Sequence, residues 1–384
     1  MDIINRELVV ARGCTEPIAI ATAAAIARRY VFGRIISINV NASRNILKNA
    51  MSVKIPGTNS CGINLAAALG TLVQVLDKNL LLMEVKDEDM ENALKMIKSG
   101  VVTVQLADSS KKLYIEVVVE TEQSKSRVII EDEHNNVALI EVDGKKLKNK
   151  TIKNVKTSKK FASTNMDFLS LDFILEFVQQ VDIRKLGLIK DAIEMNMNIC
   201  LEGLSKPYGL NVGRSIKSKM ELGILAKDTA NYAVALTAAG SDARMAGSGL
   251  PAMSNSGSGN QGISATIPVV VFAEAFDSDE DDLLRAVTLS NLITIYIKSR
   301  LGRLSALCGA TIAATGACCG ITYIMGGGDA EIKSAIQNIT GNVTGIICDG
   351  AKAGCALKVA TCTTAAINLL LLRWKATQLH RQTG

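Results

Sequence analysis

Three cysteines are the residues of this chain whose surroundings best suit metal chemistry. Cys14 precedes an expected helix, whose dipole and free amides stabilise a thiolate. Cys308 and Cys348 are each followed within two residues by glycine, which allows close approach. The chain of 384 residues holds only two histidines, so a catalytic site must be built from cysteine, acidic residues, lysine, tyrosine or backbone groups. Thiolate–metal chemistry is therefore the leading hypothesis.

The other cysteines are expected to fill the core, because a free cysteine most often behaves as a small buried hydrophobe. No C-x-x-C pair occurs among the nine cysteines, so the sequence supports neither a zinc ribbon nor thioredoxin-like redox chemistry. No secretory signal is visible, which favours reduced thiols or metal ligands over disulfides. The expected core cysteines are Cys61, Cys200, Cys318, Cys319, Cys355 and Cys362.

A glycine-rich segment is a second candidate for chemistry. Residues 257–262, G-S-G-N-Q-G, match the G-x-G-x-x-G pattern of dinucleotide-binding proteins. That function is disfavoured, because residues 251–256 do not look like the strand that the motif requires. Two interpretations stay open: a loop whose backbone amides bind a carboxylate at a helix N-terminus, or a tight turn between helices.

The composition indicates a globular protein, with 48% hydrophobic and 21% charged residues. The net charge of +6 owes much to the lysine-rich residues 145–160, where no arginine or aromatic residue is interleaved. We interpret this segment as a solvated linker and expect no nucleic-acid partner. Residues 304–325 and 359–372 are nearly uncharged, but small-residue runs also suit the centre of a helical domain. We expect a soluble, cytoplasmic protein that does not enter a membrane.

The first part of the chain mixes helix and strand patterns. An alanine-rich helix is expected over 16–30, with Thr15 as its N-cap, and a polar loop over 41–49. From residue 101 onward the segments alternate as strands and are separated by polar turns, which predicts an antiparallel meander. The expected strands are 35–40, 101–106, 113–121, 127–131 and 137–142, and a second helix is expected over 62–76.

Helical patterns dominate after residue 166. The predicted fold class is α+β, with an N-terminal mixed α/β region that contains an antiparallel sheet and a mainly helical C-terminal domain. We expect one domain over 1–160, which carries Cys14, and a helical domain over 161–384. The expected helices of the second domain are 167–181, 186–204, 216–239, 281–298, 302–317 and 353–378.

Five motifs lie in order along nearly the whole chain. They are G-C-T-E-P-I-A at 13–19, Asn45 with Lys48 and Asn49, I-P-G-T at 55–58, G-S-G-N-Q-G at 257–262, and C-D-G-A-K-A-G-C at 348–355. A single short match could arise by chance, but five blocks in one order do not. Together they resemble the L-cysteine desulfidase family, which is related to the alpha part of iron–sulfur L-serine dehydratases.

The resemblance implies a [4Fe–4S] cluster held by Cys14, Cys308 and Cys348, with one iron left open and no pyridoxal phosphate. An iron with an open position acts as a Lewis acid, and soft iron prefers a thiolate, which favours cysteine over serine as the substrate. The implied reaction is β-elimination of L-cysteine to hydrogen sulfide, ammonia and pyruvate, with the substrate thiolate on the open iron. The expected partner is a small-molecule amino acid, and a homo-oligomer is expected.

Two residues are candidates for the base that removes the Cα proton. Lys352 follows the expected ligand Cys348 by four residues, and Glu16 follows Cys14 by two. Each has a structural alternative: Lys352 could pair with Asp349, and Glu16 could complement a helix N-terminus. The candidates for holding the ammonium and carboxylate groups of the substrate are Asn45, Lys48, Asn49, Thr58, Asn260 and Gln261.

Other functions stay open. The same cluster could serve L-serine dehydration. The protein could also be a non-enzymatic iron–sulfur sensor or carrier, whose cluster would take a fourth protein ligand from Cys318, Cys319 or Cys355. A helical membrane protein built from small residues is the third alternative.

Overall fold

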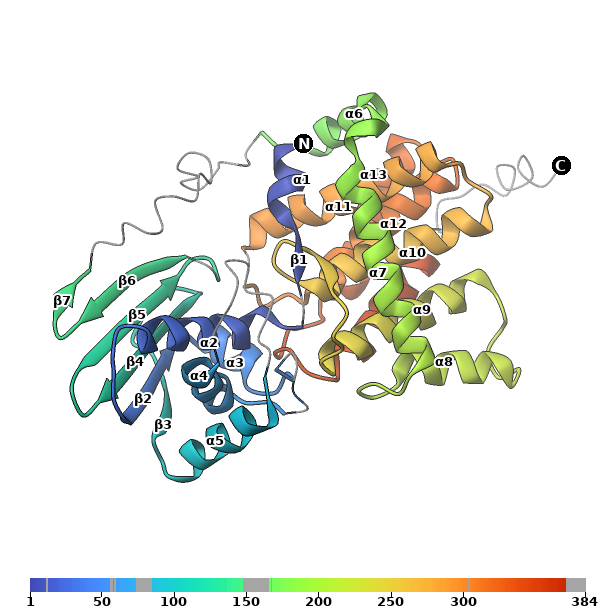
Figure 1. Cartoon of the computed structure of the whole chain (residues 1–384). Helices are drawn as coiled ribbons and strands as arrows, with labels where there is room; N and C mark the ends of the chain where they lie inside the picture. The colour runs from blue at the N-terminus through green and yellow to red at the C-terminus, as the bar shows by residue number, and fades with distance from the viewer. Residues whose placement is uncertain are drawn as a thin grey trace. The chain divides into compact units, whose positions relative to one another are not determined.

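The computed structural model describes residues 1–11, 13–55, 58, 60–73, 85–134, 136–147, 166, 168–302 and 304–370. The fold class is α+β, and the chain divides into two compact units (Figure 1). The helical unit comprises Met1–Ala11, Met166–Cys348 and the residues from Ala353 onward. The sheet unit comprises Arg12–Asn165 and Asp349–Lys352.

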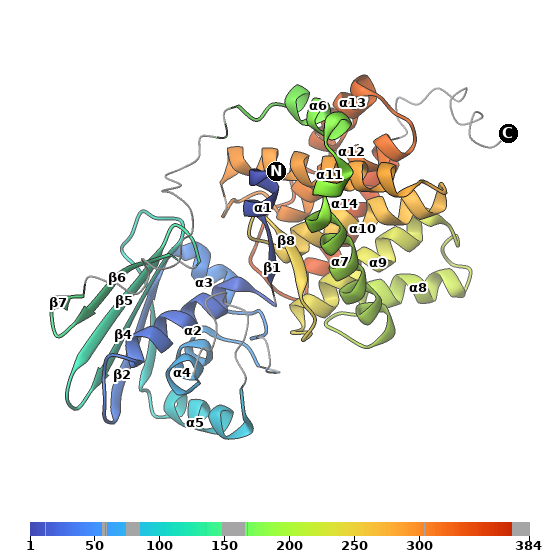
Figure 2. The same cartoon turned by 45° about the horizontal axis from the view of Figure 1, so that its top comes forward.

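Two short segments depart from the expected division at residue 160. Residues Met1–Ala11 belong to the helical unit, because strand β1 (Leu8–Ala11) pairs antiparallel with strand β8 (Ala252–Asn255) (Figure 2). Residues Asp349–Lys352 belong to the sheet unit, although the chain on both sides of them is part of the helical unit. Each unit therefore contains residues from both halves of the sequence.

The sheet unit is built on a six-stranded sheet with the order β3-β2-β4-β5-β6-β7. From β4 onward the strands form the expected antiparallel meander. The expectation is wrong for β3, which pairs parallel with β2, because the helices between them provide the crossover that parallel pairing needs. The strands are β2 (Ile35–Ala42), β3 (Val102–Leu106), β4 (Tyr114–Thr121), β5 (Lys125–Glu131), β6 (Val137–Val142) and β7 (Lys145–Lys146).

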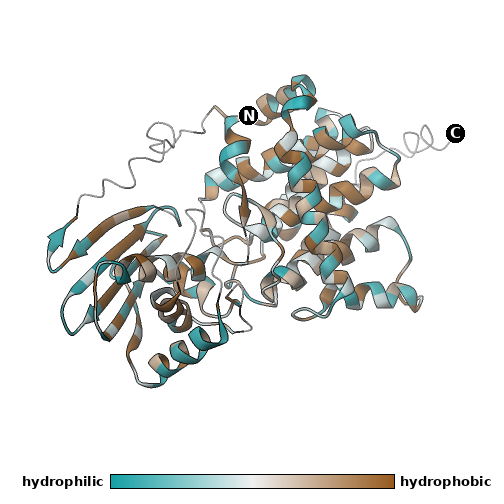
Figure 3. Ribbon diagram, viewed as in Figure 1, coloured by the Kyte–Doolittle hydropathy of each residue, from teal (hydrophilic) through white to brown (hydrophobic). Residues whose placement is uncertain are grey.

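Helices cover one face of this sheet. Helix α2 (Thr15–Arg28) packs on β4 and β5 and against α4 (Ile63–Leu72), which in turn contacts α5 (Asp87–Lys98). Cys14 is the N-cap of α2, so the expected Thr15 cap is off by one residue. The expected loop over 41–49 is also wrong, since its residues form the end of β2 and α3 (Arg44–Ala50). Figure 3 shows α4 as mostly hydrophobic and α5 as mostly hydrophilic, as their positions require.

The helical unit has α12 near its centre, in contact with α10, α11, α13 and α14. Its interior is lined by small and aliphatic side chains, including those of the uncharged run before residue 325. Within the described ranges, no helix is both long and apolar enough to cross a membrane. The helices are α1 (Asp2–Glu7), α6 (Leu171–Gln180), α7 (Gly187–Ser205), α8 (Val212–Glu221), α9 (Thr229–Met245), α10 (Gly259–Ala275), α11 (Glu280–Leu301), α12 (Gly309–Ile324), α13 (Asp329–Val343) and α14 (Cys355–Leu370).

Three expectations about this unit are corrected. The helix expected over 216–239 is two helices, because Asp228 accepts a hydrogen bond from the Asn231 N–H at 2.8 Å and starts α9. The helix expected over 302–317 begins only at Gly309, after Cys308. Residues 252–255 were expected to be irregular, but their pairing with β1 makes them a strand. The expected extension of the last helix beyond residue 370 lies outside the described residues.

Candidate functional site

Cys308 and Cys348 lie close together in the helical unit. An isolated antiparallel bridge joins Leu307 to Ile347, so each cysteine is next to a bridged residue on facing segments. The Cys308 N–H donates to the Ile346 carbonyl at 3.0 Å, which extends this pairing. Two cysteines that are distant in the sequence are therefore held as neighbours by backbone hydrogen bonds.

The thiol of Cys308 interacts with a third cysteine as well. Cys308 is buried and is the N-cap of α12, while Cys355 is the half-buried first residue of α14. Burial raises the pKa of the Cys308 thiol, and the Ala310 N–H lowers it by a hydrogen bond. The neighbouring Cys348 and Cys355 raise the same pKa further. Cys355 was expected to fill the core, but these interactions group it with the other two.

The donor set in the helical unit consists of cysteine thiols, which are the ligand type of iron–sulfur clusters. Among the residues that the structure describes, no three His, Cys, Asp or Glu side chains converge closely enough to hold one metal ion. A four-iron cluster is wider than one ion, so its ligands need not converge on a point, and cysteine thiolates are its usual ligands. The grouping of Cys308, Cys348 and Cys355 therefore fits an iron–sulfur cluster in its chemistry.

Cys14 takes part in a different arrangement, in the sheet unit. Its thiol donates to Glu16 Oε2 at 2.8 Å, and Asn49 Nδ2 donates to Glu16 Oε1 at 2.9 Å. His134 Nε2 lies 3.8 Å from Glu16 Oε1, within ion-pair distance. The Glu16 carboxylate is thus shared by groups from α2, α3 and the turn between β5 and β6.

The electrostatics of this arrangement keep Glu16 ionised. Burial alone would raise the pKa of Glu16, but the His134 imidazole and the hydrogen bonds from Cys14 and Asn49 hold it well below its usual range. A carboxyl group with so low a pKa is a weak base near neutral pH. A Cys14 thiolate would also be repelled by this carboxylate, since two negative charges in contact are unfavourable.

His134 was missed by the sequence reasoning, which found no usable histidine. The residue follows the end of β5, in a turn where Asp132 has a φ of +67°. The sheet carries this turn back to the N-terminus of α2, so the histidine becomes a neighbour of Glu16 only through tertiary structure. No local pattern around residue 134 signals this contact.

The expected substrate loop and the segment after Cys348 lie side by side in the sheet unit. A side chain at Gly350, whose φ is +101°, would overlap the Lys48 carbonyl of α3. Lys352 Nζ lies 2.5 Å from Asp349 Oδ2, which is the ion pair that the sequence offered as an alternative. The Lys352 side chain is 42% exposed, so it is not a buried lysine.

The other expected substrate-binding residues of this unit differ in their burial and in their hydrogen bonds within the protein. Asn45 is half-buried on α3, next to the pair of Lys48 and Asn49. The Thr58 hydroxyl lies within hydrogen-bond distance of the Ile55 carbonyl, at 3.0 Å, so it is used within its own turn. Residues 56 and 57 of the same motif lie outside the described residues, as do residues 148–160 of the lysine-rich segment.

The glycine-rich loop opens α10 directly after β8. A strand therefore does precede the motif, contrary to the expectation from sequence. Dinucleotide binding is still not supported, since among the described strands β8 pairs with β1 alone, antiparallel, and forms no βαβ unit. Gly262 is needed for packing, because a side chain there would overlap the Met253 carbonyl.

The two polar residues of this loop point into the protein. Gln261 is fully buried, and its Nε2 donates to the Asn255 carbonyl at 3.2 Å. A Cβ at Gly309, the first residue of α12, would lie 3.0 Å from Gln261 Oε1. Asn260 Oδ1 accepts from Arg244 Nη1 at 3.3 Å, and Arg244 is buried although the sequence reasoning did not single it out. The loop thus borders the segment that carries Cys308.

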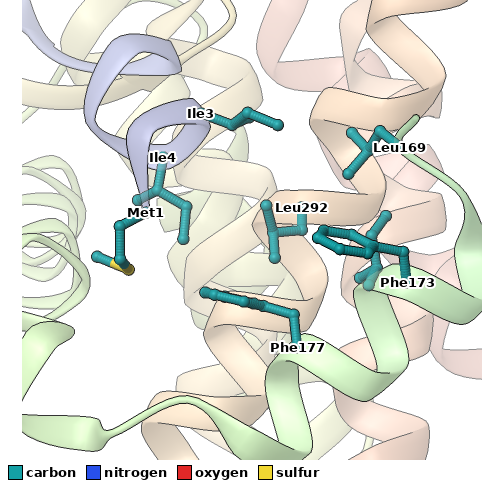
Figure 4. A pocket seen from close by; sticks show the side chains of 8 residues that line it. Met1, Ile3, Ile4, Leu169, Phe173, Phe177 and Leu292 are labelled. Carbon is teal, nitrogen blue, oxygen red and sulfur yellow. The ribbon is translucent and has the colours of Figure 1, made fainter. Parts of the chain in front are cut away.

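A separate pocket in the helical unit is lined by hydrophobic side chains. They come from α1, α6 and α11 and the segment before α6, and include Ile4, Phe173, Phe177 and Leu292 (Figure 4). No titratable side chain lines this pocket. Two candidate sites therefore remain, each within one unit: Cys308, Cys348 and Cys355 in the helical unit, and Cys14 with Glu16 in the sheet unit.

Comparisons with known proteins identify the family. Residues 84–381 match the model of the serine dehydratase alpha chain. A UPF0597 protein of Clostridium perfringens is 44% identical over 366 residues, which cover 95% of this chain and 85% of that protein. UPF0597 proteins of Oleidesulfovibrio alaskensis and Parabacteroides distasonis are 41% and 40% identical, over 100% and 97% of this chain and 89% and 86% of theirs. The chain therefore belongs to the serine dehydratase alpha chain family, with the UPF0597 proteins as relatives.

Proposed function

We propose that this protein is an iron–sulfur lyase that converts L-cysteine to hydrogen sulfide, ammonia and pyruvate by β-elimination. The observation that carries the proposal is the bridge between Leu307 and Ile347, which brings Cys308 and Cys348 together in a chain of the serine dehydratase alpha family. Dehydration of serine and desulfuration of cysteine are the same elimination with different leaving groups. The family therefore supports the reaction class, and the thiolate preference of iron supports cysteine as the substrate.

Cys308 and Cys348 are the proposed ligands of a [4Fe–4S] cluster, together with one further cysteine. Cys14 stays the prediction from sequence for that third ligand. We favour Cys355, because it lies near enough to Cys308 in the helical unit to raise the pKa of the Cys308 thiol, whereas the Cys14 thiol donates to Glu16. A cluster with three protein ligands would supply an iron with Lewis-acid character for the departure of the sulfide.

The residues of the chain itself would bind the substrate and move protons. Lys352 Nζ is the proposed acceptor of the Cα proton, and it has to leave its ion pair with Asp349 and lose one proton before it can accept another. Lys48 and Asn45 are proposed to hold the charged groups of the substrate from α3, since Lys48 packs beside the segment that carries Lys352. The Asn49 side chain donates its hydrogen bond to Glu16, and Glu16 also accepts a hydrogen bond from the Cys14 thiol.

Three of the substrate-binding residues proposed from sequence are supported less by the contacts. Thr58 bonds within its turn, and Asn260 and Gln261 bond within the helical unit. Gln261 Oε1, beside Gly309, has no hydrogen-bond partner among the residues that the structure describes, and it is the proposed acceptor of a hydrogen bond from the amino group of a substrate. The buried Arg244 guanidinium beside the N-terminus of α10 is suited to a carboxylate.

The substrate is decided by a direct comparison of two amino acids. Anaerobically reconstituted protein is assayed for pyruvate with L-cysteine and with L-serine, and for sulfide with L-cysteine. The proposal predicts a higher kcat/KM for L-cysteine. A clear preference for L-serine would replace it with L-serine dehydration.

The ligand set is decided by cluster content. Iron and acid-labile sulfide are measured in Cys308→Ala, Cys348→Ala, Cys355→Ala and Cys14→Ala, with Cys200→Ala as the matched control. The first three are expected to lose the cluster, and the last two to keep it. Loss in Cys14→Ala but not in Cys355→Ala would restore the ligand set predicted from sequence. Loss in both would indicate four protein ligands and a sensor.

A further inference from the structure

We propose that Lys358 is a positioning residue of the cysteine group in the helical unit, which consists of Cys308, Cys348 and Cys355. Lys358 holds the peptide group before Cys348 in place and puts a positive charge beside the thiols. This inference rests on the proposed function, because it assigns Lys358 to the proposed cluster site. The contacts that carry it all lie within the helical unit.

Lys358 joins two segments that carry proposed ligands. It is half-buried on the first turn of α14, three residues after Cys355. Its Nζ donates a hydrogen bond to the Ile347 carbonyl at 2.9 Å, and Ile347 directly precedes Cys348. The donor is charged, and a hydrogen bond of this kind is about twice as strong as one between neutral groups. The side chain therefore ties the start of α14 to the loop that carries Cys348.

The peptide group between Ile347 and Cys348 is held from both sides. Its carbonyl accepts from Lys358, and its N–H donates to the Ala306 carbonyl at 2.7 Å. The same two loops are paired by the bridge between Leu307 and Ile347. Because this peptide group is fixed at its oxygen and at its nitrogen, the direction in which the Cys348 side chain leaves the backbone is restricted. Lys358 therefore acts on the geometry of a proposed ligand through the backbone.

The facing loop is anchored by a second lysine. Lys298 of α11 is buried, and its Nζ donates to the Ser305 hydroxyl at 3.0 Å. The Ser305 hydroxyl donates in turn to the Leu307 carbonyl at 3.0 Å, one residue before Cys308. The carbonyl before each cysteine beside the bridge thus accepts a hydrogen bond from a side chain, and a lysine supplies or supports each bond. Lys358 bonds to its carbonyl directly, so its removal is the sharper test.

The positive charge of Lys358 acts on the thiols as well as on the backbone. Burial raises the pKa of the Cys308 and Cys362 thiols, whereas the charge of Lys358 lowers both. The ammonium group is therefore close enough to these sulfur atoms to act on them electrostatically. Thiolates that bind one cluster bring several negative charges into a small volume, and a cation beside them offsets part of their repulsion. Hydrogen bonds and net charge near the cysteine ligands also set the reduction potential of a cluster.

Amide exchange tests the positioning role in the full-length, cluster-free protein. Lys358→Met removes both the donor and the charge, whereas Lys358→Arg keeps both. Lys206→Met is the matched control, because it loses the same charge from an exposed ion pair with Glu202. The exchange rate of the Cys348 N–H is measured by hydrogen–deuterium exchange with mass spectrometry of overlapping peptides. Loss of a hydrogen bond on the same peptide group should raise this rate about 3–10-fold in Lys358→Met and leave it near the wild-type value in the other two variants.

The properties of the cluster test the role of the charge. Iron retention against a chelator and the midpoint potential are measured in the anaerobically reconstituted protein, the potential by a redox titration followed by electron paramagnetic resonance. Lys358→Met should hold its iron about 10–100-fold less tightly. Its midpoint potential should be lower, because the reduced cluster carries one more negative charge and has lost a neighbouring cation. Lys358→Arg should keep both properties close to those of the wild type.

The outcomes separate this proposal from the proposed function. Exchange at Cys348 that is no faster in Lys358→Met than in Lys206→Met would overturn the positioning role. An unchanged potential in Lys358→Met, or an equal drop in Lys206→Met, would overturn the role of the charge. A wild-type protein that binds no cluster, but whose exchange responds as expected, would overturn the proposed function and leave the hydrogen bond to Ile347 standing.

Discussion

Gly350→Ala tests whether the segment after Cys348 packs on α3 as described. Gly350 has a φ of +101°, and a methyl group there would overlap the Lys48 carbonyl. The left-handed backbone costs a non-glycine residue about 1–2 kcal/mol. An overlap with backbone that has to be relieved by movement adds about 1–3 kcal/mol. The sum predicts a loss of about 2–5 kcal/mol in the free energy of unfolding.

Gly144→Ala is the matched control. Gly144 has a φ of +78° in the same unit, but nothing lies within 4 Å of its Cβ position. It should therefore show the backbone strain alone, about 1–2 kcal/mol. The free energy of unfolding of both variants is measured by urea denaturation, followed by circular dichroism. If two transitions are seen, the transition of the sheet unit is the one compared.

The difference between the two variants isolates the contact with Lys48. Gly350→Ala should also lower the activity on L-cysteine, because relief of the overlap displaces Lys352 and the chain next to Cys348. Equal destabilisation by the two substitutions, with activity unchanged in both, would refute the packing of this segment on α3.

Three further predictions concern single side chains. Burial raises the pKa of Asp242 from its usual 3.8 to about 6. The free energy of unfolding of the wild-type protein should therefore fall by up to about 3 kcal/mol as the pH rises from about 4 to about 6. Urea titrations of Asp242→Asn should show no such fall. An equally steep fall in the variant would contradict the assignment. Because the pKa of Glu16 is lowered in the folded protein, the ionised carboxylate stabilises the fold at a pH above the usual pKa of 4.5, and this stabilisation is lost as the pH falls below that value. Glu16→Gln should therefore lower the free energy of unfolding by about 3–5 kcal/mol at neutral pH. The stability of the variant should also depend less steeply on pH in the acid range. In thermal denaturation Gly316→Ala, which overlaps the Ser290 carbonyl, should be destabilised by about 1–3 kcal/mol, whereas Gly341→Ala on an open helix face should gain about 0.5–1 kcal/mol. Shifts of the same sign would argue against the packing of α11 on α12.

Local patterns in the sequence predict much of the fold, and long-range pairing accounts for most of what they miss. The helix after Cys14 and the strands after residue 113 follow from periodicity and turn residues, and the structure has them close to the expected bounds. The parallel partner of β3 could not be predicted, because register between distant strands leaves no local pattern. The strand at 252–255 was missed because its four residues form a strand only by pairing with β1.

The same distinction holds for the candidate site. The cysteines at 308 and 348 were singled out by their glycine neighbours, but their closeness depends on a bridge between two loops. His134 looked like an ordinary turn residue, and its contact with Glu16 depends on the sheet. Cys355 was assigned to the core of a helix, although it is the first residue of α14 and half-buried.

The most direct test of the central claim is spectroscopy of the anaerobically purified protein with and without L-cysteine. Electron paramagnetic resonance of the reduced protein and Mössbauer spectroscopy report the cluster type and the state of each iron. The proposal predicts a [4Fe–4S] cluster with one iron whose signal changes when L-cysteine is added, and no such change with L-alanine, which lacks the thiol. Absence of bound iron, or a spectrum that L-cysteine leaves unchanged, would contradict it.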